Sequence, residues 1–182
     1  YPKAHFFSCN LAGRDFKDYG SISAMYPISM IADRRGNIYT SDFASRLIKY
    51  DAERDRIVHL ETAAYAEPWN PTARYSPVTD MCAGPDGLIY GLTYSNDHLF
   101  RFDPEEERPR VEDIGPGLPD APAANLRCLV PDRAGNIYYT VNRVLFDASR
   151  SVLVRYRVAS GEREAVAAMR LSGEAHYPWR GV

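Results

Sequence analysis

Long hydrophobic runs are missing from this sequence: no stretch of its 182 residues approaches the ~18–20 apolar residues that span a bilayer. A basic block is missing too, because the 22 Lys and Arg and the 24 Asp and Glu are interspersed and leave a net charge of −2. We therefore expect no membrane span and no nucleic-acid partner, since binding of nucleic acid needs a phosphate-neutralising face. The first residues are neither an initiator Met nor a signal peptide, so the localisation stays open.

Cysteine is scarce as well. The three cysteines, Cys9, Cys82 and Cys128, form no Cys-x-x-Cys pair, and a disulfide framework is not indicated. Cys82 lies five residues before Gly87, and Cys128 lies seven residues before Gly135. A difference of two places both side chains on the same face of their strands. We expect free, buried thiols that act as small apolar residues.

Helical periodicity is the third absence. The best helical candidate, residues 161–169, reads equally well as a turn followed by a strand. The chain is instead rich in residues of strands and turns, with 13 Tyr, 7 Phe, 13 Pro and 12 Gly. This composition predicts an all-β fold of many short strands.

A repeat of roughly 50 residues organises these strands. A turn followed by a strand occurs at residues 33–39, 84–90 and 132–138. One apolar strand precedes each copy and two more follow it, so each unit is predicted to be a four-stranded antiparallel meander. Gly36, Gly87 and Gly135 supply the positive φ that the shared tight turn needs.

One such sheet cannot bury both of its faces, whereas packing against the next copy does so. The sequence therefore predicts a β-propeller segment of four-stranded antiparallel blades: three complete blades plus partial ones, forming an incomplete ring. The expected boundaries are a half blade at 1–24, blades at 25–74, 75–124 and 125–174, and the start of another at 175–182. Because propellers have ~4–8 blades, the remaining blades are expected from the same chain or another one. A twisted β-sandwich built from the same hairpins is the alternative.

The pattern D-x-x-G-N-I-Y, followed by L-x-R-Y-D, resembles the blades of SMP-30, NHL and streptogramin-lyase-like propellers. It is also similar to the kelch-like blades of some polysaccharide lyases. The sequence has no blade-ending Trp-Asp dipeptide and no Gly-Gly doublet, which disfavours WD repeats and kelch proper. The resemblance implies a ligand face made by two kinds of loop: those between the second and third strands, and those between blades. These superfamilies include lactonases, lyases, sugar binders and protein scaffolds, so the fold does not fix the function.

One such loop carries Tyr94, Asp97 and His98. His98 could act as a base or orient a substrate, and Tyr94 could donate a proton, as in β-elimination on a uronic-acid sugar. Arg143, in the long hairpin 142–151, is our candidate for neutralising the substrate's carboxylate. The alternative is that His98 only caps its strand, since His5 occupies the equivalent position one unit earlier.

Two loops between blades carry candidate substrate-binding residues. Aromatic platforms beside Arg suit stacking and hydrogen bonding to a sugar, and these candidates are Trp69, Arg74, Tyr75, His176 and Trp179. The alternative is that the aromatic rings pack the loops onto neighbouring blades.

A metal site has little support, because the four His are scattered without His-x-His or His-x-x-x-His spacing. No cofactor is expected. A divalent cation in the central channel, as in lactonase-type propellers, stays open, with Asp80 as one ligand.

The function expected is binding or processing of a polar ligand, with carbohydrate favoured over other small polar ligands. Its most specific form is a lyase or hydrolase that acts on an acidic polysaccharide. A non-enzymatic protein-interaction scaffold is the alternative, so whether the protein is an enzyme is left open.

Overall fold

The computed structural model describes residues 3–24, 27–64, 77–94, 98–119, 126–142 and 151–168. Within these ranges every regular element is a β-strand, as the composition predicts. No helix long and apolar enough to cross a membrane occurs in them.

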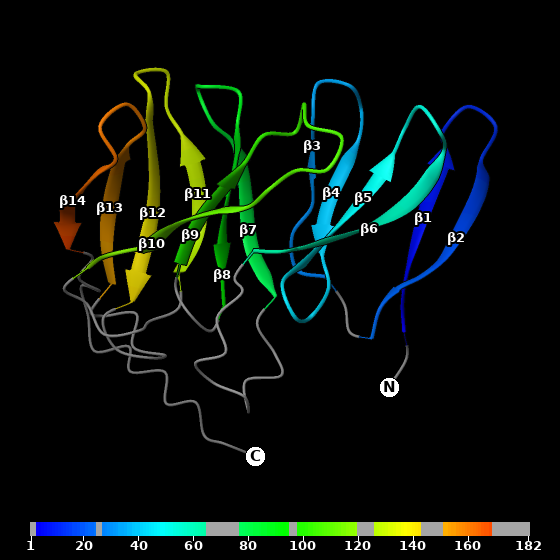
Figure 1. Cartoon of the computed structure of the whole chain (residues 1–182), viewed down its shortest axis with the longest axis horizontal. Coiled ribbons are helices and arrows are strands. Elements are labelled where there is room, and N and C mark those ends of the chain that lie inside the picture. Colours follow the sequence, from blue (N-terminus) through cyan, green and yellow to red (C-terminus); the bar gives the residue numbers. More distant parts are fainter. Residues whose placement is uncertain are drawn as a thin grey trace, which may run out of the picture.

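The strands form a two-stranded hairpin and three four-stranded sheets, all antiparallel and in chain order (Figure 1). The N-terminal hairpin contains β1 (Ala4–Asn10) and β2 (Asp15–Ser23). Sheet I contains β3 (Ile31–Ala32), β4 (Ile38–Ser41), β5 (Arg46–Asp51) and β6 (Arg56–Ala63). Sheet II contains β7 (Val78–Ala83), β8 (Ile89–Thr93), β9 (His98–Phe102) and β10 (Glu112–Pro116). Sheet III contains β11 (Leu126–Pro131), β12 (Asn136–Asn142), β13 (Ser151–Arg157) and β14 (Glu162–Ala168), so the segment near residue 161 is a turn and a strand.

An aspartate organises the repeated turn between the first two strands of sheets I and III. Asp33 Oδ1 accepts hydrogen bonds from the backbone N–H groups of Arg35 and Asn37, both at 2.9 Å. Asp132 Oδ1 accepts the same two bonds from Ala134 and Asn136, both at 2.8 Å. In each turn the Asn amide also donates to the other carboxylate oxygen at 2.8 Å. The sequence motif therefore encodes a closed local network that fixes the hairpin.

Sheet II keeps the turn but changes its residues. Gly84 stands where the other turns have Asp, and a Cβ there would overlap the ring of Tyr90, with 2.7 Å to its Cδ2. Asp86 takes over the acceptor role, bonding Leu88 N at 3.2 Å and the Tyr90 hydroxyl at 2.8 Å. Glycine at position 84 thus leaves room for the ring of Tyr90 as it is placed in sheet II.

The core lies between the sheets. Side chains of sheet I interleave with one face of sheet II, where the rings of Tyr39 and Phe102 are 5.1 Å apart. The other face of sheet II packs on sheet III, where the rings of Tyr90 and Tyr156 are 6.1 Å apart. All five residues of β8 are buried, since this strand is covered on both faces. Packing of one repeat on the next thus supplies the burial that a single sheet lacks.

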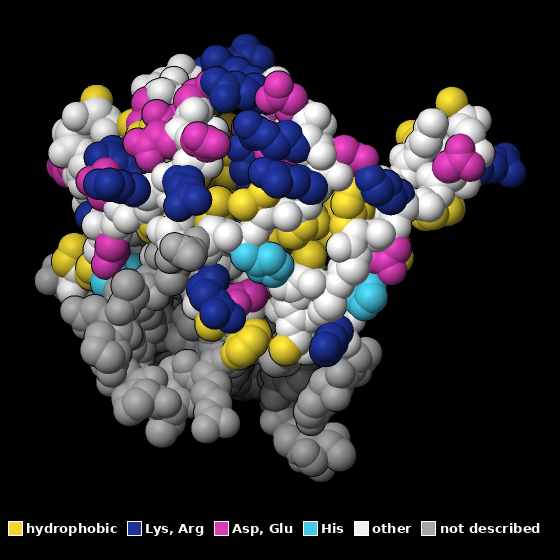
Figure 2. Space-filling model, turned by 45° about the vertical axis from the view of Figure 1, so that its right-hand side comes forward, with side chains coloured by type: hydrophobic (Ala, Val, Ile, Leu, Met, Phe, Trp, Pro, Cys, Tyr) yellow, Lys and Arg dark blue, Asp and Glu magenta, His cyan; other side chains and the backbone are white. Residues whose placement is uncertain are grey.

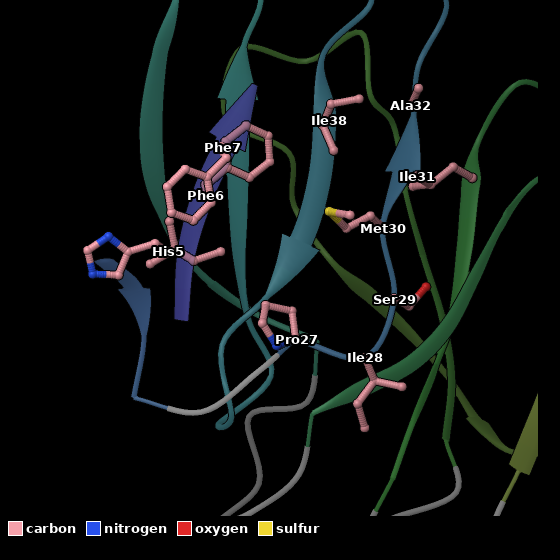
Figure 3. A pocket seen from close by; sticks show the side chains of 11 residues that line it. His5, Phe6, Phe7, Pro27, Ile28, Ser29, Met30, Ile31, Ala32 and Ile38 are labelled. Carbon is pink, nitrogen blue, oxygen red and sulfur yellow. The ribbon is translucent and has the colours of Figure 1, made fainter. Parts of the chain in front are cut away.

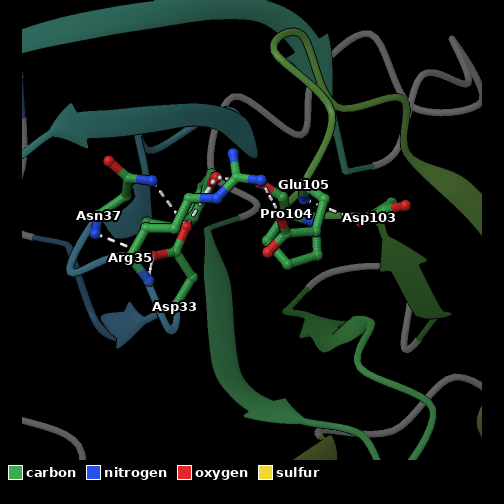
Figure 4. A network of polar contacts seen from close by, with 7 residues as sticks. Asp33, Arg35, Asn37, Asp103, Pro104 and Glu105 are labelled. Atoms are coloured by element: carbon green, nitrogen blue, oxygen red, sulfur yellow. Dashed lines mark hydrogen bonds and ion pairs between the residues drawn. The ribbon is translucent and has the colours of Figure 1, made fainter. Parts of the chain in front are cut away.

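A polar contact crosses between sheets I and II at the turns (Figure 4). The guanidinium of Arg35, in the first turn of sheet I, pairs with Glu105 in the β9–β10 turn. The Tyr39 hydroxyl of sheet I also donates to the carbonyl oxygen of Pro104 in the same turn, at 3.1 Å. Asp103 Oδ1 accepts from Glu105 N at 2.8 Å, which stabilises the start of the β9–β10 turn.

The cysteines follow the sequence expectation only in part. Cys82 is buried, whereas Cys128 is exposed, so the expected burial of Cys128 is wrong. The register of β11 against β12 shifts between Arg127 and Val130, and Cys128 has a positive φ of 63°. An extra residue at this β-bulge breaks the two-residue alternation on which the expectation rested.

This difference predicts a labelling pattern for the thiols. Burial raises the pKa of Cys82 to about 12, so this thiol is both inaccessible and un-ionised near neutral pH. We expect a thiol reagent to modify Cys9 and Cys128 rapidly in the native protein and Cys82 only after denaturation. Peptide mapping by mass spectrometry checks this, and rapid native labelling of Cys82 would contradict the packing of sheet II on sheet III.

An exposed aspartate ties the N-terminal hairpin to sheet I. Asp55, in the β5–β6 turn, accepts hydrogen bonds from Lys17 and Tyr19 of β2 and from Tyr50 of β5. These three donors lower the pKa of Asp55 from 3.8 to about 2. Because the folded pKa is below the ordinary value, the contribution of this carboxylate to stability is present above about pH 4 and is lost as the pH falls toward 2.

Acid is therefore expected to loosen the hairpin from sheet I in that window. The NMR signals of β1 and β2 should shift between pH 4 and 2 before those of β8. The Asp55→Asn variant should lack this step, because its side chain does not titrate. Hairpin signals that titrate identically in the variant would show that another group is responsible.

Candidate functional site

Antiparallel order divides the molecule into two ends. Strands β4, β8 and β12 run toward one end, which we call the loop end, and the repeated turns lie at the other (Figure 1). The loop end holds the connections between the second and third strands, and also those from each sheet to the next. It is therefore where the sequence places its candidate ligand residues.

Two of these candidates are described by the structure. Tyr94 follows β8, is half-buried, and donates its backbone N–H to Pro77 O at 3.1 Å. His98 begins β9 on the other side of the same loop. The remaining candidates lie outside the described residues: Asp97, Arg143, Trp69, Arg74, Tyr75, His176 and Trp179.

His98 is held by a carboxylate that the sequence analysis did not single out. Its Nδ1 lies 2.8 and 2.9 Å from the two carboxylate oxygens of Asp113 on β10. Asp113 Oδ1 also accepts the backbone N–H of Gly115 at 2.8 Å, where φ is +88°. The His98 side chain is 20% exposed, so the pair lies at the surface rather than within the core.

The N-terminal hairpin repeats this arrangement. His5 Nδ1 lies 3.1 and 3.0 Å from the oxygens of Asp18, and Asp18 Oδ1 accepts Gly20 N at 2.7 Å. The Gly20 N–H and His5 lower the pKa of Asp18. The signal was present in the sequence as the parallel segments Asp18-Tyr19-Gly20 and Asp113-Ile114-Gly115.

The arrangement has a structural use in both places. It fastens the third strand to the outermost strand where a glycine with positive φ shifts the register. In sheets I and III the histidine position holds Arg46 and Val152, so the pair is not part of every unit. A carboxylate on Nδ1 also fixes the orientation of the imidazole, which is the arrangement found in acid–base dyads. Both roles are therefore chemically available to His98.

The Asp80 carboxylate accepts hydrogen bonds from two backbone N–H groups. Its Oδ1 accepts Met81 N at 2.9 Å, and its Oδ2 accepts Leu129 N at 2.7 Å. The second bond joins β7 of sheet II to β11 of sheet III, so Asp80 couples two sheets through their innermost strands. In the described part of the chain, no group of three or more His, Cys, Asp or Glu side chains is arranged to hold a metal ion.

An apolar groove of about 460 Å³ lies between the hairpin and sheet I (Figure 3). Its lining includes Phe7, Ile31 and Ile38. Phe7 and Met30 are 57% and 63% exposed, which is unusual for side chains of this size. Within the described residues β1 pairs only with β2, so its other edge is open beside this groove.

Neither a protein-family model nor a curated protein matches this chain. Solved structures do match its fold. Virginiamycin B lyase from Staphylococcus aureus is 12% identical, with a TM-score of 0.64 over 88% of this chain and 47% of the enzyme. A streptogramin B lyase structure is 16% identical, with a TM-score of 0.59 over 84% and 44% of the two chains. The β-propeller domain of Cps50 (Swd1) from Myceliophteria thermophila is 12% identical, with a TM-score of 0.57 over 91% and 50%.

These likenesses and the packing of successive sheets identify the fold as a β-propeller, with four-stranded antiparallel blades in an open, partial ring. The chain spans about half the length of the propellers that it matches. At such low identity the comparison establishes the fold alone, and it includes both lyases and a propeller domain that is not named as an enzyme.

Proposed function

We propose that this chain is part of a β-propeller that binds an acidic carbohydrate at its loop end and cleaves it by β-elimination. The observation that carries the proposal is the His98–Asp113 pair, which presents an oriented, partly exposed imidazole at the loop end. Tyr94 lies at the other end of the same loop, directly after β8. The names of the two lyases among the similar structures support an elimination chemistry on this fold.

In this proposal each residue has its own role in the reaction. His98 removes the proton on the carbon next to the sugar carboxylate, and a carbon–carbon double bond forms as the bond to the leaving oxygen breaks. Tyr94 donates a proton to that oxygen. Arg143, or Arg74 in its place, neutralises the carboxylate, and Asp97, Trp69, Tyr75, His176 and Trp179 contact the sugar.

The ring in this proposal is completed by further blades, from the same chain or another one. The open edge of β1 and the exposed apolar groove beside it support this, because added strands would cover both. The blade boundaries at 24/25, 74/75, 124/125 and 174/175 remain part of the proposal.

The test compares the catalytic activity of the whole protein with that of variants at the two histidines that pair with aspartate. Turnover of polygalacturonate is followed through the absorbance of the unsaturated product, with neutral dextran as the comparison substrate. His98→Ala should lower the rate by about 100-fold or more, the usual contribution of a general base. Tyr94→Phe should lower it comparably.

The matched control is His5→Ala, which breaks the equivalent His–Asp pair in the hairpin and should leave the rate unchanged. Equal losses in the two histidine variants would assign both pairs a structural role and overturn the catalytic one. Absence of both turnover and binding of any acidic polysaccharide would overturn the proposed ligand and favour the scaffold function.

A further inference from the structure

A second groove, of about 490 Å³, lies between sheets I and II, where β5 and β6 face residues 107–110. Basic side chains dominate its lining: Lys49, Arg54, Arg56, Arg108 and Arg110. Asp51 and Glu107 are the lining carboxylates. Figure 2 shows Lys and Arg side chains gathered on one side of the molecule above exposed hydrophobic side chains.

The other sheets show that this positive charge is particular to sheet I. At the position of Lys49, sheets II and III place Arg101 and Arg155, and each of them pairs with a glutamate on the neighbouring outer strand. Arg101 Nε lies 2.7 Å from Glu112, and Arg155 Nη2 lies 2.6 Å from Glu164. In sheet I the residue opposite Lys49 is Val58, so the compensating carboxylate is missing.

Two pairs further along the same strands, sheets I and III differ again. In sheet III, Arg157 faces Glu162 and bonds it at 2.5 Å. In sheet I, Asp51 faces Arg56, but the buried Asp51 carboxylate is already engaged by Arg54 Nη1 at 2.9 Å. None of the ion pairs among the described residues includes Arg56, Arg108 or Arg110. The groove therefore holds exposed guanidinium groups that lack carboxylate partners within the described structure.

The groove also runs along a strand edge whose backbone groups have no strand partner in the described sheet. β6 is the outermost strand of sheet I and has only β5 as a partner in the described sheet. Val58 and Leu60 line the groove from one face of β6, and His59 lines it from the other, so the groove reaches around the strand's open edge. An open edge presents unpaired N–H and C=O groups to an added strand.

We propose that this groove binds an extended acidic peptide, which adds along the edge of β6 and places carboxylates on Arg56, Arg108 and Arg110. Guanidinium groups bind carboxylates in a two-pronged geometry that suits this recognition. No Phe, Tyr or Trp side chain is among the residues that line the groove, so it lacks the large aromatic platform on which sugars and single-stranded nucleic acids stack. The apolar floor of Val58, Leu60 and the buried Pro109 accepts the alternate side chains of such a peptide.

Fluorescence anisotropy of a labelled peptide with alternating Glu and Val tests the proposal on the intact protein. The Arg56→Glu/Arg108→Glu variant should bind this peptide at least about tenfold more weakly, because two attractions become repulsions. A Gln/Val peptide should show a similar loss, and added salt should weaken only the acidic peptide. The matched control Arg133→Glu reverses an exposed arginine in the first turn of sheet III and should bind as the parent does.

Equal binding by the parent and the double variant would overturn the site, as would equal binding of the two peptides. A sulfated oligosaccharide or single-stranded nucleic acid that binds in place of the peptide would overturn the ligand class. N-methylation of alternate peptide amides should abolish binding, and unchanged affinity of that peptide would overturn addition along the β6 edge. None of these binding measurements depends on catalytic turnover at the loop end, so they can fail or succeed independently of the proposed lyase activity.

Discussion

The Gly91→Ala variant is expected to lose about 3 kcal/mol or more of its free energy of unfolding, a large overpacking cost for one methyl group. Gly91 lies in the middle of β8, directly opposite Phe100 on β9. A Cβ at position 91 would lie 2.6 Å from Cε1 of the Phe100 ring, and that ring is fully buried between sheets I and II. The ring has no room to move, so the sheets must separate or the strand must distort. Urea unfolding of the parent and the variant measures the loss.

A double variant separates this cause from a general effect of the substitution. Gly91→Ala/Phe100→Leu opens space where the new methyl group points, so it should be more stable than the sum of the two single losses predicts. Strictly additive losses would show that Gly91 and Phe100 do not compete for the same volume.

The Asp80→Ala variant is expected to lose about 3 kcal/mol, because it removes two charge-assisted hydrogen bonds and leaves the Leu129 N–H without its acceptor. The hydrogen bond to Leu129 joins sheets II and III, so the variant should weaken the contact between these two sheets. In a repeat array, stability depends on such nearest-neighbour contacts, so sheet III should unfold partly on its own. Urea titration should show a lower midpoint with a broader transition.

Hydrogen exchange locates the effect. The Leu129 amide should exchange faster in Asp80→Ala, whereas amides of β4 and β5 in sheet I should keep their protection. Asp80→Asn keeps one acceptor oxygen and should lose less. An unchanged Leu129 exchange rate would contradict the coupling role of Asp80.

Local motifs explain why much of the fold can be predicted from the sequence. The Asp33 and Asp132 turns close entirely within five residues, so their chemistry can be predicted without any knowledge of neighbouring sheets. The two-residue alternation of the strands likewise follows from local geometry. Contacts between repeats, such as the Asp80–Leu129 bond, need the register of two strands that are 49 residues apart and have no local signal.

Exceptions to periodicity mark the limits of that reasoning. Cys128 is exposed because a bulge inserts one residue, and no period-two argument detects such an insertion. The partner of His98 could have been found, because an Asp–x–Gly segment follows both histidines, with its Asp 15 residues after His98 and 13 residues after His5. The loss of ion-pair partners in sheet I becomes visible only when the strand registers of all three sheets are compared.

The crystal structure of the protein in its complete natural form is the most direct test of the propeller account. It should show sheets I, II and III as consecutive blades of a closed ring of about six to eight. The open edge of β1 should pair with one further strand, a second strand should complete that blade, and Phe7 and Met30 should be covered. A structure in which that edge and groove face solvent, or in which these sheets stack as a two-layer sandwich, would contradict the account.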